Sequence, residues 1–167
     1  PPVAKREGDN PFTGIAQVDE TSIALTGQSL EIQGYQTTKT LILTDTELVL
    51  EGELRAGAIV LRKGSTIRHP KRARIDAPPI AVTAGYLEID ATSAIDLDGS
   101  GVSDPDNQRQ PSHGGLADGA GREALYGSLV YPVRVGRGEA GGGAVIVSVG
   151  ELVLDGRISA RGLGFSS

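Results

Sequence analysis

Short runs of alternating apolar and polar residues recur along the chain, separated by Gly, Asp and Thr. The clearest run is residues 40–52, TLILTDTELVLEG, which reads as strand, polar turn, strand and glycine. Val, Ile, Thr and Leu dominate these runs, and their period of two matches side chains that alternate across a strand, so they predict β-strands rather than helices. Copies of the pattern occupy residues 22–39, 40–57, 58–75, 80–101 and 144–162.

Equivalent apolar positions recur at constant spacing in the first three copies, which carry Ile or Leu 18 residues apart. A fixed period near 20 residues is typical of repeats that stack and bury a shared apolar interior. The spacing therefore predicts ladders of stacked side chains. These are Ile23/Leu41/Ile59, Leu25/Leu43/Leu61 continuing into Val82 and Val147, and Leu30/Leu48 continuing into Leu87 and Leu152.

The predicted fold class is all-β, a right-handed parallel β-helix (solenoid) of about five coils with one long glycine-rich loop insertion. A β-sandwich of short antiparallel hairpins is the alternative, because it also gives regularly spaced strands. The predicted domains are a linker and N-terminal cap at residues 1–21 and a β-helix domain at residues 22–167, with the loop inserted at residues 102–143.

The N-terminal cap is predicted because a solenoid end exposes an open sheet edge that needs covering. Residues 1–21 contain three prolines and little periodicity. Phe12, Ile15 and Val18 are its apolar residues expected to lie over the first coil.

Composition narrows the classes of function. The 167 residues contain 24 Gly, four Tyr, two Phe and no Trp, so the core is aliphatic and offers few sugar-stacking platforms. There is no Cys, which excludes disulfides and cysteine metal sites. A net charge of −5 argues against nucleic-acid binding, and no apolar run approaches the roughly 20 residues of a membrane span.

One basic cluster lies at residues 62–74 and surrounds His69. It is interpreted either as a docking patch for an acidic partner or as a solvated corner that prevents edge-to-edge pairing. Two tyrosines of the 102–143 loop are the other candidates for contact with a partner. The candidate partner-binding residues are Arg68, Lys71, Arg72, Arg74, Tyr126 and Tyr131.

An acidic turn follows the fourth copy, at residues 96–106, DLDGSGVSDPD. Ca²⁺ favours several carboxylate and carbonyl oxygens in a flexible loop with glycine at the bend. The candidate ligands are Asp96, Asp98, Asp104 and Asp106, although the spacing is not that of an EF-hand and polar turn residues explain the stretch equally well. No cofactor is required, and Ca²⁺ is the only candidate.

A series of glycine-rich motifs runs from the loop to the last copy. It comprises His113-Gly114-Gly115, Tyr126-Gly127-Ser128-Leu129, Pro132, Gly136, Gly138, Gly141-Gly142-Gly143-Ala144 and the segment 152–162, LVLDGRISARG. This order resembles a glycine-rich module of very large bacterial secreted and surface proteins, some of which carry Rhs-type repeats that form toxin-encapsulating shells. The resemblance covers about residues 22–162 and implies an extracellular, non-catalytic module, but no functional residues.

Three functions follow from these patterns. The first is a non-catalytic structural or adhesive module, a rigid spacer or scaffold whose partners are flanking domains of the same polypeptide. The second is a glycan- or protein-binding module acting through the 102–143 loop. The third is a polysaccharide-degrading enzyme, for which Asp96, Asp98 and Arg157 are the nearest candidates; no nucleophile elbow or phosphate-binding loop is present.

Overall fold

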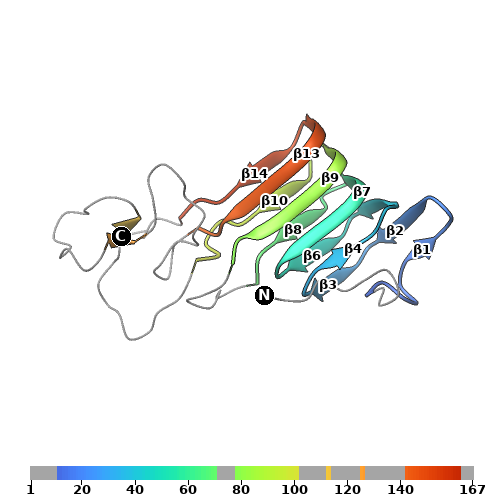
Figure 1. Cartoon of the computed structure of the whole chain (residues 1–167), viewed down its shortest axis with the longest axis horizontal. Helices are drawn as coiled ribbons and strands as arrows, with labels where there is room; N and C mark the ends of the chain where they lie inside the picture. Colours follow the sequence, from blue (N-terminus) through green and yellow to red (C-terminus); the bar gives the residue numbers. More distant parts are fainter. Residues whose placement is uncertain (1–10, 71–77, 102–111, 114–124, 127–141, 163–167) are drawn as a thin grey trace. The chain divides into compact units, whose positions relative to one another are not determined.

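A computed structural model describes residues 11–70, 78–101 and 142–162, together with two short strands at residues 112–113 and 125–126. The chain divides into two compact units. Unit 1 comprises Pro1–Arg68, Ile80–Asp96 and Ile146–Ser159, and unit 2 comprises His69–Pro79, Leu97–Val145 and Ala160–Ser167. Unit 1 contains the stacked strands in Figure 1.

Two sheets make up unit 1, and the chain passes between them (Figure 1). The larger sheet has seven strands and the smaller has five. The larger contains β1 (Gln17–Val18), β2 (Ser22–Thr26), β4 (Tyr35–Gln36), β5 (Thr40–Thr44), β7 (Glu53–Arg62), β9 (Ile80–Ile89) and β13 (Val145–Leu154). The smaller contains β3 (Ser29–Ile32), β6 (Glu47–Leu50), β8 (Thr66–Arg68), β10 (Ala94–Asp96) and β14 (Arg157–Ser159).

In unit 2, β11 (Ser112–His113) pairs in parallel with β12 (Leu125–Tyr126). Both strands belong to the segment that breaks the repeat. Its remaining residues, apart from 142 and 143, lie outside the described part of the chain.

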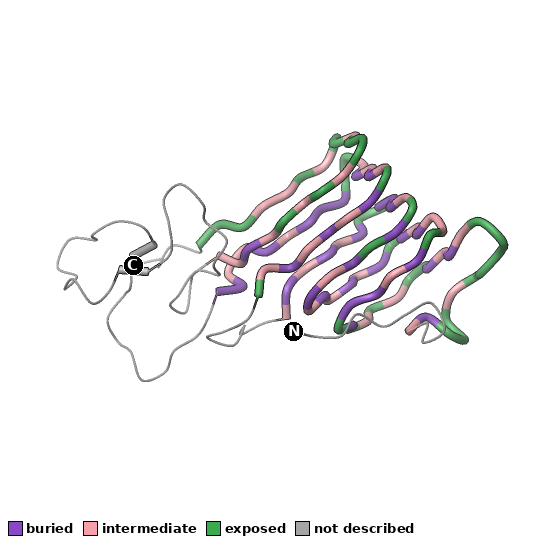
Figure 2. Tube along the Cα trace, viewed as in Figure 1, coloured by how far each residue is buried: buried purple, intermediate pink, exposed green. Residues whose placement is uncertain are grey.

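The repeat predicted the pairing of the first strands correctly. Strands β2, β5 and β7 pair in parallel, so that Leu25 lies beside Leu43, which in turn lies beside Leu61. The ladder of Ile23, Leu41 and Ile59 runs beside it in the same register. All these residues are at most 1% exposed and belong to the buried class, which is coloured purple in Figure 2. Their aliphatic surface, removed from water, is the main stabilising contribution to unit 1.

The predicted continuations of these ladders are wrong at β9. Leu61 pairs with Ile89, whereas Val82 pairs with Leu54. Leu48 pairs with Ile67, and Leu87 belongs to the ladder of Ile59. The segment between β8 and β9 lengthens the repeat here, so extrapolating the earlier spacing assigns residues to the wrong columns.

The predicted fold class is also wrong. The described strands form two sheets of mainly parallel strands, with antiparallel β1 at one end, and no closed solenoid is found in these parts of the chain. An all-β right-handed parallel β-helix of about five coils is therefore not the observed architecture. The apolar alternation determined strand faces and neighbours, but it carries no information about whether the sheets close on one another. The antiparallel-hairpin alternative fails as well, because consecutive long strands pair in parallel.

Among residues 11–21, the described part of the N-terminal segment, only Phe12 is buried. Phe12 is fully buried and its ring meets that of Tyr35 edge-on, with centroids 4.9 Å apart. Ile15 and Val18 were expected to cover the apolar interior, yet they are 42% and 51% exposed. Strand β1 pairs with only Ile23 and Ala24 of β2.

The ten-residue strands β7 and β9 change their inward face at a central glycine. In β9, Val82 and Ala84 are buried before Gly85, whereas Leu87 and Ile89 are buried after it. The even positions face inward on one side of the glycine and the odd positions on the other, so both halves of the strand supply apolar side chains. The equivalent glycines of β7 and β13 are Gly57 and Gly150.

Candidate functional site

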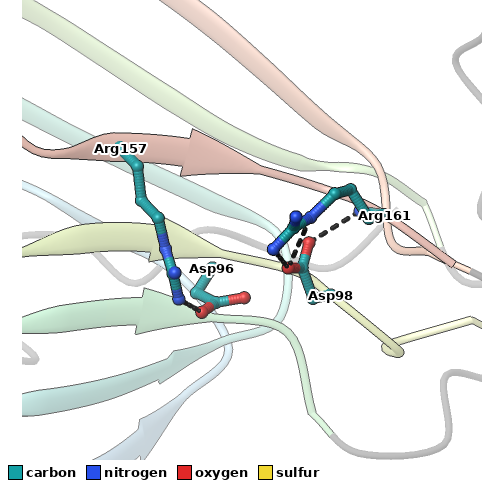
Figure 3. A network of polar contacts seen from close by, with 4 residues as sticks. All are labelled: Asp96, Asp98, Arg157 and Arg161. Atoms are coloured by element: carbon teal, nitrogen blue, oxygen red, sulfur yellow. Dashed lines mark hydrogen bonds and ion pairs between the residues drawn. The ribbon is translucent and has the colours of Figure 1, made fainter. Parts of the chain in front are cut away.

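The acidic turn of unit 2 is held by an arginine from the C-terminal segment. The Asp98 carboxylate accepts hydrogen bonds from the Arg161 backbone N–H at 2.7 Å and from its Nε and Nη2 at 3.1 and 2.9 Å (Figure 3). The Gly99 N–H donates to the Arg161 carbonyl at 3.0 Å. The Asp98 side chain is 13% exposed, so its charge is compensated by a fixed partner rather than by water alone.

A second arginine–carboxylate pair joins β10 to β14 in unit 1. Parallel pairing places Ala94 beside Arg157, and the Arg157 guanidinium binds the Asp96 carboxylate (Figure 3). Asp96 and Asp98, the candidate carboxylates of a polysaccharide-degrading enzyme, are thus each bound by an arginine that lies some sixty residues away in the sequence.

Calcium binding by the acidic turn stays a prediction. Asp104 and Asp106 lie outside the described residues, so their distance from Asp98 is not defined. In the described part of the chain, no group of three or more His, Cys, Asp or Glu side chains is gathered as a metal site would require. A calcium ion at Asp98 would have to displace the Arg161 guanidinium or share the Asp98 carboxylate with it.

The basic cluster is described only at its start. Arg68 forms an ion pair with Glu47 at 2.8 Å, across the pairing of β8 with β6. Lys71, Arg72 and Arg74 lie outside the described residues. Arg68 therefore joins β8 to β6. A docking role for Lys71, Arg72 and Arg74 stays a prediction.

His69 and the tyrosines complete the sequence-based candidates. His69 is 2% exposed, and its Nδ1 and Nε2 lie 3.4 Å from the carbonyl oxygens of Pro70 and Pro78, respectively. The ring bridges the two ends of the segment 71–77, which makes it a structural residue. Tyr126 belongs to β12 but its side chain is not described, and Tyr131 lies outside the described residues.

A ladder of buried hydroxyl groups joins the turns between the two sheets. Ser93 Oγ accepts from the Ser65 N–H at 3.1 Å, Ser65 Oγ accepts from the Thr46 N–H at 3.2 Å, and Thr46 Oγ1 accepts from the Gln28 N–H at 3.5 Å. The three hydroxyl residues are at most 2% exposed. Each satisfies a backbone donor of the preceding turn, which removes the cost of burying that donor. Sequence reasoning missed this ladder, although a Ser or Thr at the same point of successive turns was its visible signal.

Asp90 extends these turn contacts outward. Its carboxylate accepts hydrogen bonds from the Lys63 N–H at 2.7 Å, the Thr92 N–H at 2.9 Å and the Thr92 hydroxyl at 2.8 Å. Desolvation by burial raises the pKa of Asp90, but the hydrogen bonds from Lys63, Ser93 and Thr92 outweigh it and hold the pKa well below the usual value. Lys63 has a left-handed φ of 54°, so the Asp90 contact also holds an unfavourable backbone conformation.

The Asp90 contacts predict a loss of stability in acid. Because the folded-state pKa lies below the unfolded value of about 3.9, the stabilisation is fully present above that pH and is lost progressively as the pH falls from there through the folded-state pKa. We expect Asp90→Asn to lower the urea midpoint at pH 7 and to reduce the drop in midpoint between pH 7 and pH 3. Asp155→Asn is the control, since Asp155 has no side-chain hydrogen bond among the described residues. An equal acid response in wild type and Asp90→Asn would contradict this assignment.

Strand β13 is the candidate contact surface. It ends the larger sheet in the described part of the chain, and its apolar side chains Ile146, Leu152 and Leu154 are 44–45% exposed. By contrast, Leu87 and Ile89 of the neighbouring β9 are fully buried. The prediction of Leu152 as a buried ladder residue is therefore wrong, because no further strand covers it in the described structure.

No helix among the described residues has the length and apolar character needed to cross a membrane. No protein-family model, curated protein or solved structure matches this chain.

Proposed function

We propose that the chain is a non-catalytic structural module, a rigid spacer or scaffold within a larger secreted or cell-surface protein. The observation that carries this proposal is the in-register stacking of β2, β5, β7 and β9, whose interior consists of fully buried aliphatic side chains. A sheet whose inner strands are each fixed by a neighbour on both sides resists bending and keeps its two ends at a set separation.

The charged groups support a structural role because they join neighbouring strands. Arg62 of β7 binds Glu88 of β9 at 3.4 Å, and Thr83 of β9 donates to Glu53 of β7 at 3.2 Å. In the smaller sheet, Ser29 donates to Glu47 at 3.3 Å, and Glu47 also binds Arg68. These carboxylates are distributed along the stack with partners of their own and do not converge on one point, as paired catalytic carboxylates do.

The extracellular location rests on the glycine-rich motifs of residues 113–162 and on their resemblance to modules of large bacterial surface proteins. A chain without cysteine suits an oxidising environment, because it has no thiol to be oxidised there. Flanking domains of the same polypeptide are the partners that a spacer requires.

A glycan- or protein-binding module is the second candidate function. The parallel pairing of Ser112 with Leu125 and of His113 with Tyr126 favours it, because this pairing gives the 102–143 segment a structured element of its own. Long insertions between repeats are common sites of binding. A partner that binds the full chain and loses affinity when residues 102–143 are deleted would support this function.

Rigidity can be measured directly. The chain has no Cys, so Gln17→Cys with Glu151→Cys places two spin labels on β1 and β13 without background labelling. The strand order β1-β2-β5-β7-β9-β13 separates their backbones by five strand steps, about 25 Å. We expect a narrow distribution around this value from double electron–electron resonance.

A broad or bimodal distribution would contradict a rigid spacer. Release of product from an acidic polysaccharide, lost in Asp96→Ala or Asp98→Ala, would overturn the non-catalytic assignment.

A further inference from the structure

We infer that the edge of β13, which pairs with no further strand among the described residues, binds an extended strand of a defined sequence pattern. The pattern has a glycine, apolar residues three and one before it and two and four after it, and a Lys or Arg directly after the glycine. This inference rests on the proposed function, because it specifies the chemistry through which the module joins its partner.

The apolar part of the pattern comes from the exposed edge. Within unit 1, Leu54, Ile59 and Leu61 of β7 are covered by β9 and are fully buried. The corresponding apolar residues of β13 include Leu152 and Leu154, which are 44% exposed. A strand that continues the stack would cover them with apolar side chains at the same inward positions, as β9 does for β7.

The glycine in the pattern is needed because the backbones of the long strands approach closely at Gly57, Gly85 and Gly150, which together form a glycine column. A Cβ at Gly85 would lie 2.9 Å from the Gly57 carbonyl oxygen, and a Cβ at Gly150 would lie 2.8 Å from the Gly85 carbonyl oxygen. Both distances are too short for a side chain, so each strand that joins the column needs glycine at this point. A strand added beyond β13 meets the Gly150 carbonyl in the same way, so a residue with a side chain there would bind less well than glycine, and a large β-branched residue least well.

The basic residue follows from the charge of the edge. Stacked strands elsewhere in unit 1 exchange Arg–carboxylate contacts, as between Arg62 and Glu88 and between Arg157 and Asp96. Glu151 directly follows the column glycine in β13, and it forms no ion pair among the described residues. A cation on the incoming strand, directly after its own glycine, would lie opposite Glu151.

A second copy of this chain fits the edge less well. The column requires glycine opposite Gly150, so two β13 strands could pair only about Gly150 itself. Their Glu151 carboxylates would then face each other directly in a parallel pair or diagonally in an antiparallel pair, and like charges repel at both positions. Strands β1, β2 and β3 at the other end of the stack contain no Lys or Arg, so these strands do not offer the missing cation.

The probe is a labelled synthetic peptide with the sequence of residues 80–89 carrying Tyr86→Arg and Glu88→Arg, extended by a soluble tail. Binding to the full 167-residue chain is measured by fluorescence anisotropy. We expect saturable binding, at least about tenfold weaker for the same peptide with Gly85→Val, since a clash of this kind costs a comparable factor in packed interiors. A peptide with Glu in place of both arginines should also bind more weakly.

Two protein variants locate the contact. Leu152→Lys, at an exposed position that should not disturb folding, is expected to abolish binding, whereas Glu151→Arg is expected to reverse the preference so that the Glu peptide binds better. Equal binding of all three peptides, absence of binding, or insensitivity to Leu152→Lys would overturn the inference. Sedimentation that shows a dimer lost on Leu152→Lys would assign the edge to a second copy instead. The spin-label distance is measured without peptide, so a rigid chain that binds no peptide would contradict only this inference.

Discussion

Replacing Leu43 by alanine is expected to lower the free energy of unfolding by about 3–4 kcal/mol. Leu43 is fully buried, and it lies between Leu25 and Leu61 in adjacent strands, which are fully buried as well. Alanine would remove three carbons from the centre of the ladder. The flanking leucines are held in place by their own strands, so the cavity would close only in part.

Urea denaturation followed by circular dichroism measures this loss. Ile42→Ala is the matched control, because Ile42 is an aliphatic residue in the same strand with its side chain on the opposite, half-buried face. We expect the control to cost about 1 kcal/mol, as fits a partly exposed aliphatic side chain. Similar losses for the two variants would show that the face of β5 has been assigned wrongly.

Replacing Gly57 by alanine is expected to destabilise the chain by about 3 kcal/mol, with Gly85→Ala costing less, about 1 kcal/mol. An added Cβ at Gly57 would come within 2.2 Å of the Thr38 carbonyl oxygen, whereas at Gly85 the nearest atom is 2.9 Å away. Neither glycine has a positive φ, so the cost arises from the close approach of two backbones and not from the backbone conformation. An alanine at Gly57, the more crowded of the two sites, would force strand β7 away from its neighbour.

The order of the two effects is the informative result. Thermal denaturation of both variants shows which substitution destabilises the chain more. Gly27→Ala is a control for the cost of backbone conformation without crowding. Gly27 has a φ of 64° and no atom within 4 Å of an added Cβ, so its cost comes from the left-handed conformation alone, about 1 kcal/mol. A larger loss for Gly85→Ala than for Gly57→Ala would contradict the crowding argument.

Sequence reasoning succeeded where the repeat was uniform. The constant spacing of Ile23, Leu41 and Ile59 was sufficient to predict their pairing, because register and side-chain face are set together in a strand. The same reasoning failed at Val82, since the length of the preceding loop does not reveal where pairing resumes. It also failed for the architecture, because period-two alternation is equally compatible with sheets that close and sheets that stay open.

The candidate sites were harder to predict for a related reason. Asp96 and Asp98 form a plausible cation site when read locally, but their observed partners are Arg157 and Arg161, which the pairing of β10 with β14 brings near. Exposure of Leu152 depends on whether another strand follows β13 in space, and its own apolar character gives no hint of this. The hydroxyl ladder of Thr46, Ser65 and Ser93 could have been found by comparing equivalent turn positions.

The pairing of each strand with the equivalent strand of the preceding repeat also bears on how such a chain changes length in evolution. Residues 40–57 contain β5, β6 and the first half of β7. An in-frame duplication of this segment would add strands to both sheets and leave every apolar side chain on its original face. A single-residue insertion within β5 would instead turn Leu41 or Leu43 outward. Growth by whole units is therefore compatible with folding, whereas growth by single residues within a strand is not.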